Sequence, residues 1–457
     1  MSTLGQKPAT QHVSTEKQTI TGNGGTSYTL QQSVSQASDI EVFVNNTRQE
    51  PTVAYTANNT TLTMTGAVNA SDSFYVIFQG KAIQTAGLPV DAAITASTIT
   101  TSQTITSTGN VTTSGTLNTP SINGGQIGGR RNIIINGAML VAQRGTSFNY
   151  TTTDAYSLDR FRIDVTGGDN SAGAFTLTQA DVTDLPGFTK AMKFDVTTAD
   201  TSIAAGEALN LSYRIEGQDL QQLKKGTSEA EKFTISFYVK GTAKTYALEV
   251  LDIDTGGNRS IAKTFNVTTS WNRVILTFDG DTTGPLDNDA NRSLDLNFFF
   301  HAGSTYTGGT LQTSWGAMTN NERAAGIGSL YSSTDNELFI TGLQMEVGSV
   351  ATAFEHRSFA EEQQLCFRYC RKFTTLNFGR ARDGDSFYGG AVHFSPPMRA
   401  TPTLSDATYT NNTGNVGTPG INSGQGPSAD SIQLYNSGSS WTANSFPKLT
   451  GIFAAEL

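Results

Sequence analysis

The segment between Pro89 and Arg130 constrains the fold most, because a single aliphatic residue recurs in it every five or six positions. Thr, Ser, Gly and Asn fill most of the positions between. So few aliphatic side chains cannot build a hydrophobic core within one chain. The segment is either a disordered polar linker or a shaft in which several chains pool their aliphatic side chains along an axis. The residues on that axis would be Ile94, Ile99, Ile105, Val111, Leu117, Ile122 and Ile127.

Composition favours strands over helices, both in this segment and in the chain as a whole. Thr, Ser and Gly are weak helix formers, and the aliphatic spacing matches neither the 3.6-residue helical period nor a seven-residue repeat. In the full 457 residues, charged residues make up 15%, apolar residues 37%, and there are 46 glycines. This mixture is typical of short strands with many turns. We therefore expect a mainly β protein with a β-structured shaft.

Charge and cysteine content exclude several classes of protein. The net charge of -9 argues against nucleic acid as a partner, because phosphate binding needs concentrated Lys and Arg. Only two cysteines, Cys366 and Cys370, are present, which excludes a disulfide scaffold. The first 18 residues lack an apolar export signal, and no apolar run is long enough to span a membrane. We expect a chain made in a cytoplasm, without membrane insertion.

Turn residues and changes of composition divide the chain into six segments. Four short apolar runs in the first β-domain predict its strands, at Tyr28–Leu30, Ile40–Val44, Thr61–Met64 and Phe74–Phe78. The predicted segments are a polar arm (1–18), a small β-domain (19–89), the shaft (90–131), a β-sandwich (132–358), a helix (359–373) and a small carboxy-terminal β-domain (374–457).

Alternating apolar residues predict the largest domain. The alternation is seen in FTISFYV at 233–239, YALEVL at 246–251, RVILTF at 273–278, SLDLNFFF at 293–300 and LQMEV at 343–347. Such runs with turns between them indicate two antiparallel sheets in a jelly-roll-like sandwich. The one predicted helix, SFAEEQQLCFRYCRKF at 358–373, begins with Ser358 and Glu361 at the spacing of a capping box.

Six motifs follow one another after Asn132. They are NIIINGAMLVAQRGTSF (132–148), AYSLDRFRI (155–163), TSWNRVILTF (269–278), LFITGLQMEVGSVATAFEHRSFAEEQQLCFRYCRKF (338–373), FSPPMRATPTL (394–404) and the terminal AAEL. Together they resemble a jelly-roll, carbohydrate-binding-like module that recurs in bacteriophage tail-fibre and receptor-binding proteins. The segment IEVFVNNTRQEPTVAYTANNTTLTMTGAVNASDSFYVIFQG (40–80) resembles small β-domains at the front of other phage fibre-like proteins.

The resemblance implies a structural virion protein, assembled in the bacterial host cytoplasm and located in the virion tail. It implies a homotrimer, whose amino-terminal domain attaches to other tail or baseplate proteins. The carboxy-terminal β-domains would mediate host attachment by binding a surface polysaccharide. Two alternatives stay open: a structural appendage of the neck, head or baseplate that binds no receptor, and a glycan depolymerase.

Paired carboxylates are the first test for an enzyme, because glycosidases place two carboxyl groups roughly 5–10 Å apart across a sugar. Candidate pairs are Asp252 with Asp254 and Asp279 with Asp281, all next to turns. Asp is favoured at turns because it bonds to its own backbone. We find no parallel β-helix repeat, G-x-S-x-G motif or P-loop. We therefore expect no enzyme, no catalytic residues and no cofactor.

Metal sites are not expected either. The run 287–291 has the alternating oxygen ligands of a calcium loop, but Arg292 and Phe298 stand where an EF-hand needs Gly and Glu. A solvated loop is the simpler interpretation. Cys366 and Cys370 would need two further ligands to hold zinc, and the four histidines show no paired spacing. We expect both cysteines to pack as small apolar side chains.

Aromatic side chains on loops are the candidate sugar contacts, because sugar C–H groups stack on flat rings beside polar donors and acceptors. For each ring taken singly, structural packing or a contact between subunits is the alternative. Trp271, just before a strand, is predicted to be a core residue. The carbohydrate-binding candidates are Tyr306, Trp315, Tyr331 and Trp441.

Overall fold

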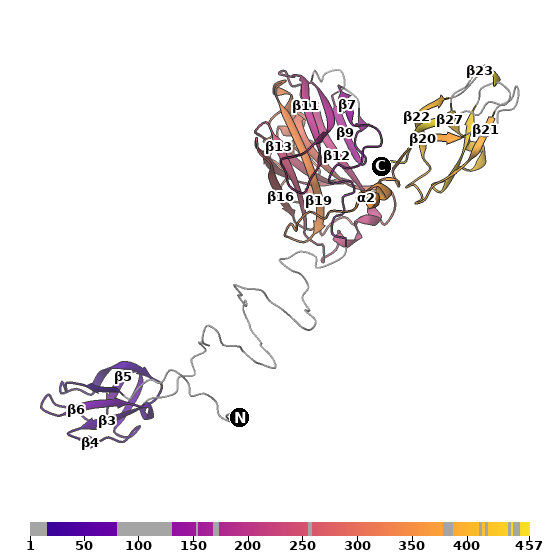
Figure 1. Ribbon diagram of the computed structural model, residues 1–457. Coiled ribbons are helices and arrows are strands. Elements are labelled where there is room, and N and C mark those ends of the chain that lie inside the picture. The colour runs from indigo at the N-terminus through magenta and orange to yellow at the C-terminus, as the bar shows by residue number, and fades with distance from the viewer. Residues whose placement is uncertain are drawn as a thin grey trace, which may run out of the picture. The chain divides into compact units, whose positions relative to one another are not determined.

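The computed structural model confirms a mainly β protein (Figure 1). Two compact units, Met1–Thr113 and Ser114–Leu457, are described separately. The predicted domain bounds stay a prediction, and the seven predicted axis residues lie outside the described residues. The structure describes residues 16–79, 130–151, 154–167, 173–254, 258–377, 387–410, 414–415, 419–436, 440–441 and 448–457.

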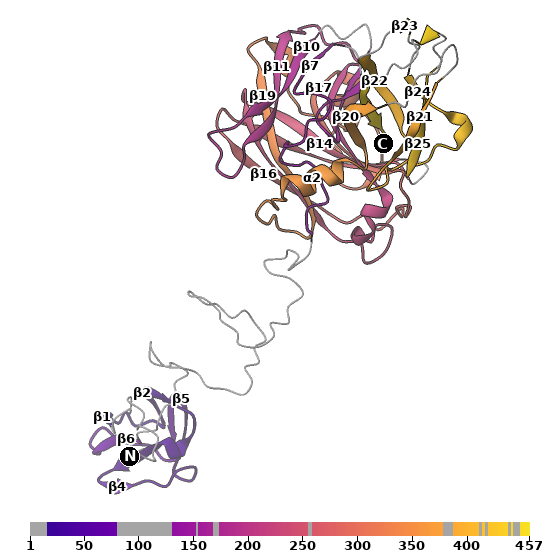
Figure 2. The same cartoon turned by 45° about the vertical axis from the view of Figure 1, so that its right-hand side comes forward.

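The amino-terminal unit contains a four-stranded antiparallel sheet and a two-stranded one (Figure 2). Their orders are β1-β6-β3-β4 and β2-β5. The four predicted strands are confirmed, because each lies within a strand of the structure. Alternate residues of these strands, such as Leu30, Val42 and Val76, form one buried core. The strands are β1 (Glu16–Thr19), β2 (Ser27–Val34), β3 (Ile40–Val44), β4 (Thr47–Arg48), β5 (Tyr55–Met64) and β6 (Phe74–Phe78).

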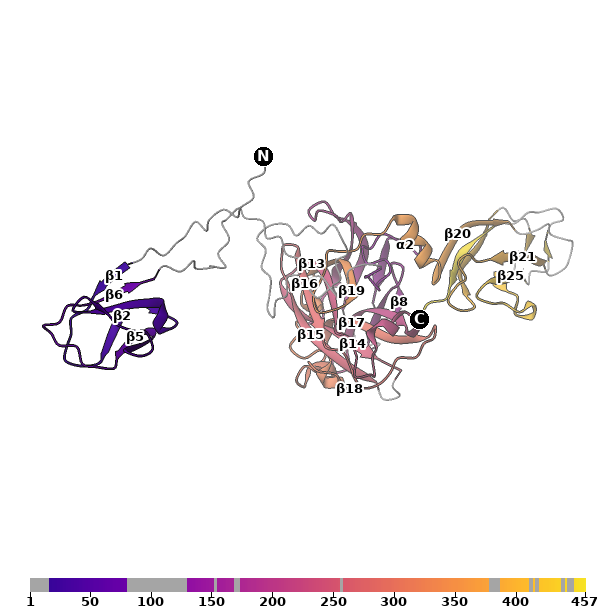
Figure 3. The same cartoon turned by 90° about the horizontal axis from the view of Figure 1, so that it is seen from below.

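Two antiparallel sheets form the predicted sandwich, and Figure 3 shows their strands in two layers. The six-stranded sheet, ordered β16-β13-β19-β11-β10-β7, contains β7 (Ser147–Tyr150), β10 (Ala174–Asp181), β11 (Lys190–Thr198), β13 (Phe233–Gly241), β16 (Asn272–Phe278) and β19 (Glu337–Val347). The seven-stranded sheet, ordered β18-β15-β14-β17-β12-β9-β8, contains β8 (Ala155–Tyr156), β9 (Phe161–Thr166), β12 (Ala208–Glu216), β14 (Lys244–Asp252), β15 (Arg259–Val267), β17 (Arg292–Ala302) and β18 (Gly316–Ala317).

The alternating apolar residues of both sheets meet in one core, as the sequence pattern predicts. Phe237 of the six-stranded sheet contacts Phe298 of the seven-stranded sheet edge-to-face, with ring centroids 5.1 Å apart. Phe194 and Phe300 pack across the core in the same way. Burying each such ring contributes about 1.5–3 kcal/mol. The sandwich is therefore held together by aromatic packing between its layers.

Strand β19 carries one extra residue in its middle. Gly342 has a φ of 64° there, and the pairing of β19 with β13 shifts register nearby. This is the geometry of a β-bulge. Because the bulge reverses the side-chain alternation, apolar residues on both sides of it face the core: Leu338, Ile340, Leu343 and Met345.

The predicted helix over 358–373 is correct at its start and wrong at its end. Helix α2 (Phe359–Cys366) begins where Ser358 Oγ accepts a hydrogen bond from the Glu361 backbone N–H at 3.2 Å. Residues Cys370–Asn377 form strand β20 instead, which pairs with β27 (Lys448–Ala454). Pairing with a distant strand overrides the helical pattern of this segment. The described part of the chain contains no helix long and apolar enough to cross a membrane.

Cys366 ends helix α2 and Cys370 begins strand β20, so the two cysteines do not lie on one helix. Both are buried and neither forms a disulfide. Their prediction as packed side chains is confirmed by this burial. Burial also raises the pKa of the Cys366 thiol well above its usual value. Both cysteines therefore lie in the interior as neutral thiols.

The carboxy-terminal residues form two three-stranded sheets and one two-stranded sheet, with the orders β20-β27-β22, β21-β25-β24 and β23-β26. Phe394, Leu434 and Phe453 belong to a core that the two three-stranded sheets share. The remaining strands are β21 (Phe387–His393), β22 (Thr403–Thr410), β23 (Gly414–Asn415), β24 (Pro419–Ile421), β25 (Ser431–Asn436) and β26 (Ser440–Trp441).

Candidate functional site

The four aromatic residues predicted to contact sugar have different environments. Tyr331 is fully buried in the sandwich core, so its prediction as a sugar contact is wrong. Its ring packs on Phe175 and His301 because the turn that carries it folds inward over the core. Trp441 belongs to β26, and its side chain lies outside what the structure describes. Neither ring supplies a described sugar-binding surface.

Tyr306 and Trp315 lie on connections next to the seven-stranded sheet. Tyr306, in the short helix α1 (Ser304–Thr307), packs on Phe299 and near the guanidinium of Arg323. Trp315 packs partly against the core, and its Nε1 donates a hydrogen bond to the Asp279 carbonyl oxygen at 2.7 Å. Both rings are half-buried. Tyr306 and Trp315 stay predicted sugar contacts, and each ring also packs against the protein.

Trp271 is not a core residue, which corrects the prediction from sequence. It is half-buried and helps to line an open hollow of about 650 Å³. The alternation of strand β16, which follows Trp271, already indicates that Trp271 faces outward. Val274 and Phe278 of β16 face the core, so Trp271 has the same parity as the outward-facing Arg273 and Ile275.

Four connections of the six-stranded sheet build this hollow, which we call the Trp271 hollow. The connection from β10 to β11 supplies Asp184, the segment before β19 supplies Asp335, and the start of β19 supplies Glu337. The end of β13 with the turn that follows it, and the turn from β15 to β16, supply the rest. The lining residues are Asp184, Lys240, Gly241, Thr242, Ala243, Thr269, Ser270, Trp271, Asp335 and Glu337.

Hydrogen bonds hold the aromatic and charged groups of the hollow in place. The Asp184 carboxylate accepts from Lys240 Nζ at 2.7 Å and from Trp271 Nε1 at 2.8 Å. The Lys240 ammonium lies 5.1 Å from the Trp271 ring centroid and 4.9 Å from that of Phe339. The bonds from Lys240 and Trp271 lower the pKa of Asp184. Asp184 is therefore an ionised acceptor beside the Trp271 ring at neutral pH.

Charged groups continue from the hollow along the outer face of the sheet. Lys193 Nζ lies 3.0 Å from Glu337 and 3.4 Å from Asp195, and 5.5 Å from the Phe339 ring centroid. Burial would lower the pKa of Lys193, but these two carboxylates raise it. Aromatic faces and ionised groups thus alternate on one surface, and this arrangement can stack on sugar C–H groups and bond to hydroxyls.

The carboxylate pairs considered for catalysis have structural partners. Asp252 pairs with Lys225, and it accepts the Asp254 backbone N–H at 2.9 Å. Asp281 forms two bonds with Arg259 and accepts the Thr283 backbone N–H at 3.1 Å. The predicted turn role is confirmed for both residues. In the 287–291 loop, Asp289 accepts from its neighbour Asn291.

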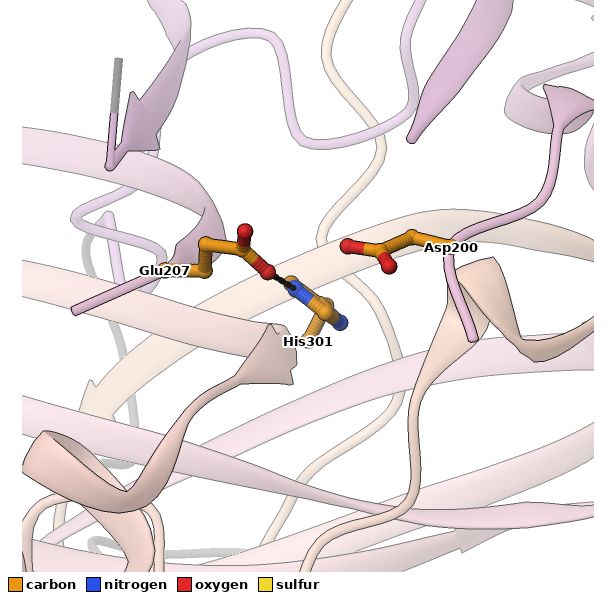
Figure 4. Close-up of side chains that lie close together, drawn as sticks. All are labelled: Asp200, Glu207 and His301. Atoms are coloured by element: carbon orange, nitrogen blue, oxygen red, sulfur yellow. Dashed lines mark ion pairs between the residues drawn. The ribbon is translucent and has the colours of Figure 1, made fainter. Parts of the chain in front are cut away.

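A buried cluster that the sequence did not suggest has the composition of a metal site. Asp200, Glu207 and His301 each offer a ligand atom, and these atoms lie within 4.8 Å of one another (Figure 4). His301 Nε2 is 3.5 Å from Glu207 Oε2. Asp200 precedes β12, Glu207 adjoins its start, and His301 lies near the end of β17. Sequence could not bring them together, because β12 and β17 pair at long range.

Burial determines the protonation of this cluster in the absence of a bound ion. It lowers the pKa of His301 to about 4, so the imidazole is neutral at neutral pH. Burial, followed by the neighbouring Asp200, raises the pKa of Glu207. The nearby Tyr331 is neutral as well, because burial raises the pKa of its phenol. Neither His301 nor Tyr331 therefore carries a positive charge that could balance the carboxylates of Asp200 and Glu207.

No protein-family model and no curated protein matches the chain. Solved structures similar to it include the enzymatically active domain of tailspike protein 4 of bacteriophage CBA120, with a TM-score of 0.27 and 14% identity over 47% of this chain and 21% of that chain. The family 11 carbohydrate-binding module of Clostridium thermocellum cellulase Lic26A-Cel5E has a TM-score of 0.23 and 11% identity, over 45% of this chain and 99% of the module. TmCBM61 in complex with β-1,4-galactotriose has a TM-score of 0.24 and 12% identity, over 48% and 99%. These matches assign neither a family nor a function.

Proposed function

We propose that this chain is a bacteriophage tail-fibre protein that attaches the virion to a bacterial surface polysaccharide. The motifs after Asn132 and their resemblance to phage receptor-binding modules support the virion role. In this proposal three chains join through the segment 90–131, and the amino-terminal unit docks on a tail or baseplate protein. The protein assembles in the host cytoplasm and ends in the virion tail.

The Trp271 hollow is the observation that carries the glycan-binding part of the proposal. Trp271 and Phe339 offer half-buried rings, and Asp184 and Lys240 offer fixed charged groups beside them. A sugar can stack on a ring while its hydroxyls replace water on Asp184, Thr242 or Ser270, which line the same hollow. Binding then selects a hydroxyl pattern through polar groups that are already positioned.

The proposed protein is a binder and not a glycan depolymerase. Asp252 and Asp281, the buried members of the two candidate pairs, are bonded to Lys225 and Arg259. A general acid needs a proton to donate, and a basic partner stabilises the ionised carboxylate instead. Incubation of the chain with the polysaccharide that it binds should therefore release no oligosaccharides.

A glycan array of bacterial capsule and O-antigen polysaccharides tests binding directly. We expect the full chain to bind a subset of these glycans, and Trp271→Ala to lower the affinity about tenfold, because a lost aromatic contact with its buried area costs about 1.5 kcal/mol. Thermal unfolding of the variant should stay close to that of the parent, since Trp271 is half-buried and adjoins a turn.

Tyr306→Ala is the matched control, because Tyr306 is a half-buried aromatic residue beside the other sheet. It should retain binding. If Tyr306→Ala lost binding while Trp271→Ala bound fully, the glycan would bind at the loop aromatic residues predicted from sequence and not at the Trp271 hollow. Failure of the parent chain to bind any polysaccharide of its host would favour a structural appendage without a receptor.

A further inference from the structure

Asp200 and Glu207 are buried carboxylates that form no ion pair with Lys or Arg among the described residues. Asp200 is 3% exposed and Glu207 is fully buried. Several other buried carboxylates of the sandwich have such a partner: Glu249 pairs with Arg323, Asp252 with Lys225 and Asp281 with Arg259. Asp159 and Glu346 are buried without an ion pair in the described part of the chain, but both of their carboxylate oxygens accept hydrogen bonds. A buried charge is strongly unfavourable unless another charge or a metal ion compensates for it. Asp200 and Glu207 thus lack the ion pairs or full hydrogen bonding that these other buried carboxylates have.

Each member of the cluster has polar atoms without a hydrogen-bond partner: Asp200 Oδ2, both Glu207 carboxylate oxygens and His301 Nε2. The hydroxyl of Tyr331, whose ring packs on His301, has no partner either. Asp200 Oδ1 accepts the Ser202 backbone N–H at 2.9 Å, and His301 Nδ1 contacts Ser329 Oγ at 2.8 Å. Asp200 and His301 are therefore fixed at one polar atom, while the other is left available.

Figure 4 shows the carboxylates of Asp200 and Glu207 and the ring of His301 directed toward one another. When Nδ1 of His301 donates to Ser329, Nε2 carries a lone pair and can bind a metal. The contact of His301 Nδ1 with Ser329 therefore holds the imidazole in the orientation that a metal ligand needs. The cluster combines buried, unpartnered donors with an oriented imidazole.

We propose that Asp200, Glu207 and His301 bind one divalent zinc ion, which ties the start of β12 to the end of β17. An imidazole nitrogen and two carboxylate oxygens are common zinc ligands, whereas calcium takes 6–8 oxygen ligands. A water molecule or the Tyr331 hydroxyl can complete a tetrahedron. Tetrahedral ligands lie about 3.3 Å apart, so the flexible Glu207 side chain closes the remaining gap.

The ion has a structural role in this proposal and is separate from glycan binding. It neutralises the two carboxylates, and it joins the connection between β11 and β12 to strand β17 of the seven-stranded sheet. Metal that binds only the folded state stabilises that state by mass action. The zinc proposal therefore stands or falls independently of the Trp271 hollow.

Zinc content and thermal unfolding of the full chain test the proposal. The chain is stripped with EDTA, dialysed against zinc chloride or calcium chloride, and its bound metal is measured by mass spectrometry. We expect about one zinc per chain and no calcium. At about 100 times the Kd, zinc should raise the unfolding temperature of the sandwich by roughly 5–10 °C.

Two variants assign the zinc to the cluster. Glu207→Gln keeps the shape of the side chain, and His301→Ala removes the nitrogen ligand. Both should lose the bound zinc and the temperature rise. His356→Ala, which removes an exposed histidine, should keep both. Cys370→Ser should keep them as well, which separates this cluster from a thiol site.

A proton shared between Asp200 and Glu207 is the competing arrangement. In that case the stripped chain takes up no zinc, and Glu207→Gln is as stable as the parent or more stable. Either result overturns the proposal. If His301→Ala fails to fold, zinc retained by the folded Glu207→Gln variant would still overturn it.

Discussion

At the scale of single residues, the most consequential interaction joins Arg160 to Glu456. Arg160 is 2% exposed, and its Nη1 donates to Glu456 Oε2 at 3.0 Å. Its guanidinium lies 3.5 Å from the Tyr369 ring centroid. Arg144 binds the other oxygen of Glu456 at 3.0 Å. A carboxylate from the terminal AAEL motif thus compensates a charge inside the sandwich.

Glu456→Ala should lower the free energy of unfolding of the sandwich by about 3–5 kcal/mol, because it leaves Arg160 buried without a counter-charge. Urea denaturation followed by tryptophan fluorescence measures the change. Glu361→Ala is the control. Glu361 forms an ion pair with Arg130, whose side chain is 60% exposed, and its loss should change stability by less than about 1 kcal/mol. Equal effects of the two substitutions would contradict the role of Glu456.

Individual functional residues were predictable only where the pattern was local. The parity of β16 indicates that Trp271 faces outward, and turn chemistry explains Asp252 and Asp281. Tyr331 looked like a loop residue because nothing near it shows that its turn folds over the core. Asp200 and His301 meet only through the pairing of β12 with β17, which leaves no local signal.

At the scale of elements, the bulge in β19 determines which side chains face the core and which face the hollow. Gly342 is the residue that permits it. A Cβ built at this position would lie 2.8 Å from Phe188 and 2.9 Å from Tyr238, and the backbone there has a φ of 64°. Both observations favour glycine.

Gly342→Ala should destabilise the sandwich by about 1–3 kcal/mol, through backbone strain and the contact with Phe188. Urea denaturation of the purified variant checks this value. Gly328→Ala is the matched control, because its new Cβ would meet only ordinary contacts at 3.8 Å and its backbone needs no left-handed conformation. An unchanged stability of Gly342→Ala would show that the bulge adapts freely.

Strand alternation predicted the elements better than helical pattern did. The five alternating runs after residue 232 lie in β13, β14, β16, β17 and β19. Helix α2 began at its predicted cap, since Ser358 bonds locally to Glu361. Its end depended on the pairing of Cys370 with Ala454, which local sequence does not encode. The start of the helix was therefore predictable, because it depends on a local hydrogen bond. Its end was not, because it depends on pairing with a distant strand.

At the scale of the whole molecule, the segment 90–131 is predicted to determine how many chains act together. Its seven predicted axis residues lie outside the described residues, so the three-chain shaft stays a prediction from sequence. A trimer would present three copies of the Trp271 hollow to one cell surface. Several weak sugar contacts can then combine into firm attachment.

Replacing Ile105, Val111 and Leu117 together by Ser should abolish assembly, because these side chains are predicted to line the axis. Sedimentation equilibrium should give three times the 48.6 kDa chain mass for the parent and a single chain mass for the variant. The control replaces the polar residue before each of them, in Thr104→Ala, Asn110→Ala and Thr116→Ala, and should stay trimeric. A trimeric Ser variant would reduce the segment to a tether.

The Arg160–Glu456 pair also limits how early the sandwich can finish folding during synthesis. The two residues are 296 positions apart in the chain, so a ribosome adding about 5–20 residues per second makes Glu456 roughly 15–60 s after Arg160. During this interval the nascent sandwich holds a cation whose partner does not yet exist. Its final closure therefore waits for the AAEL segment, and a truncated translation product lacking that segment would be left open to proteolysis.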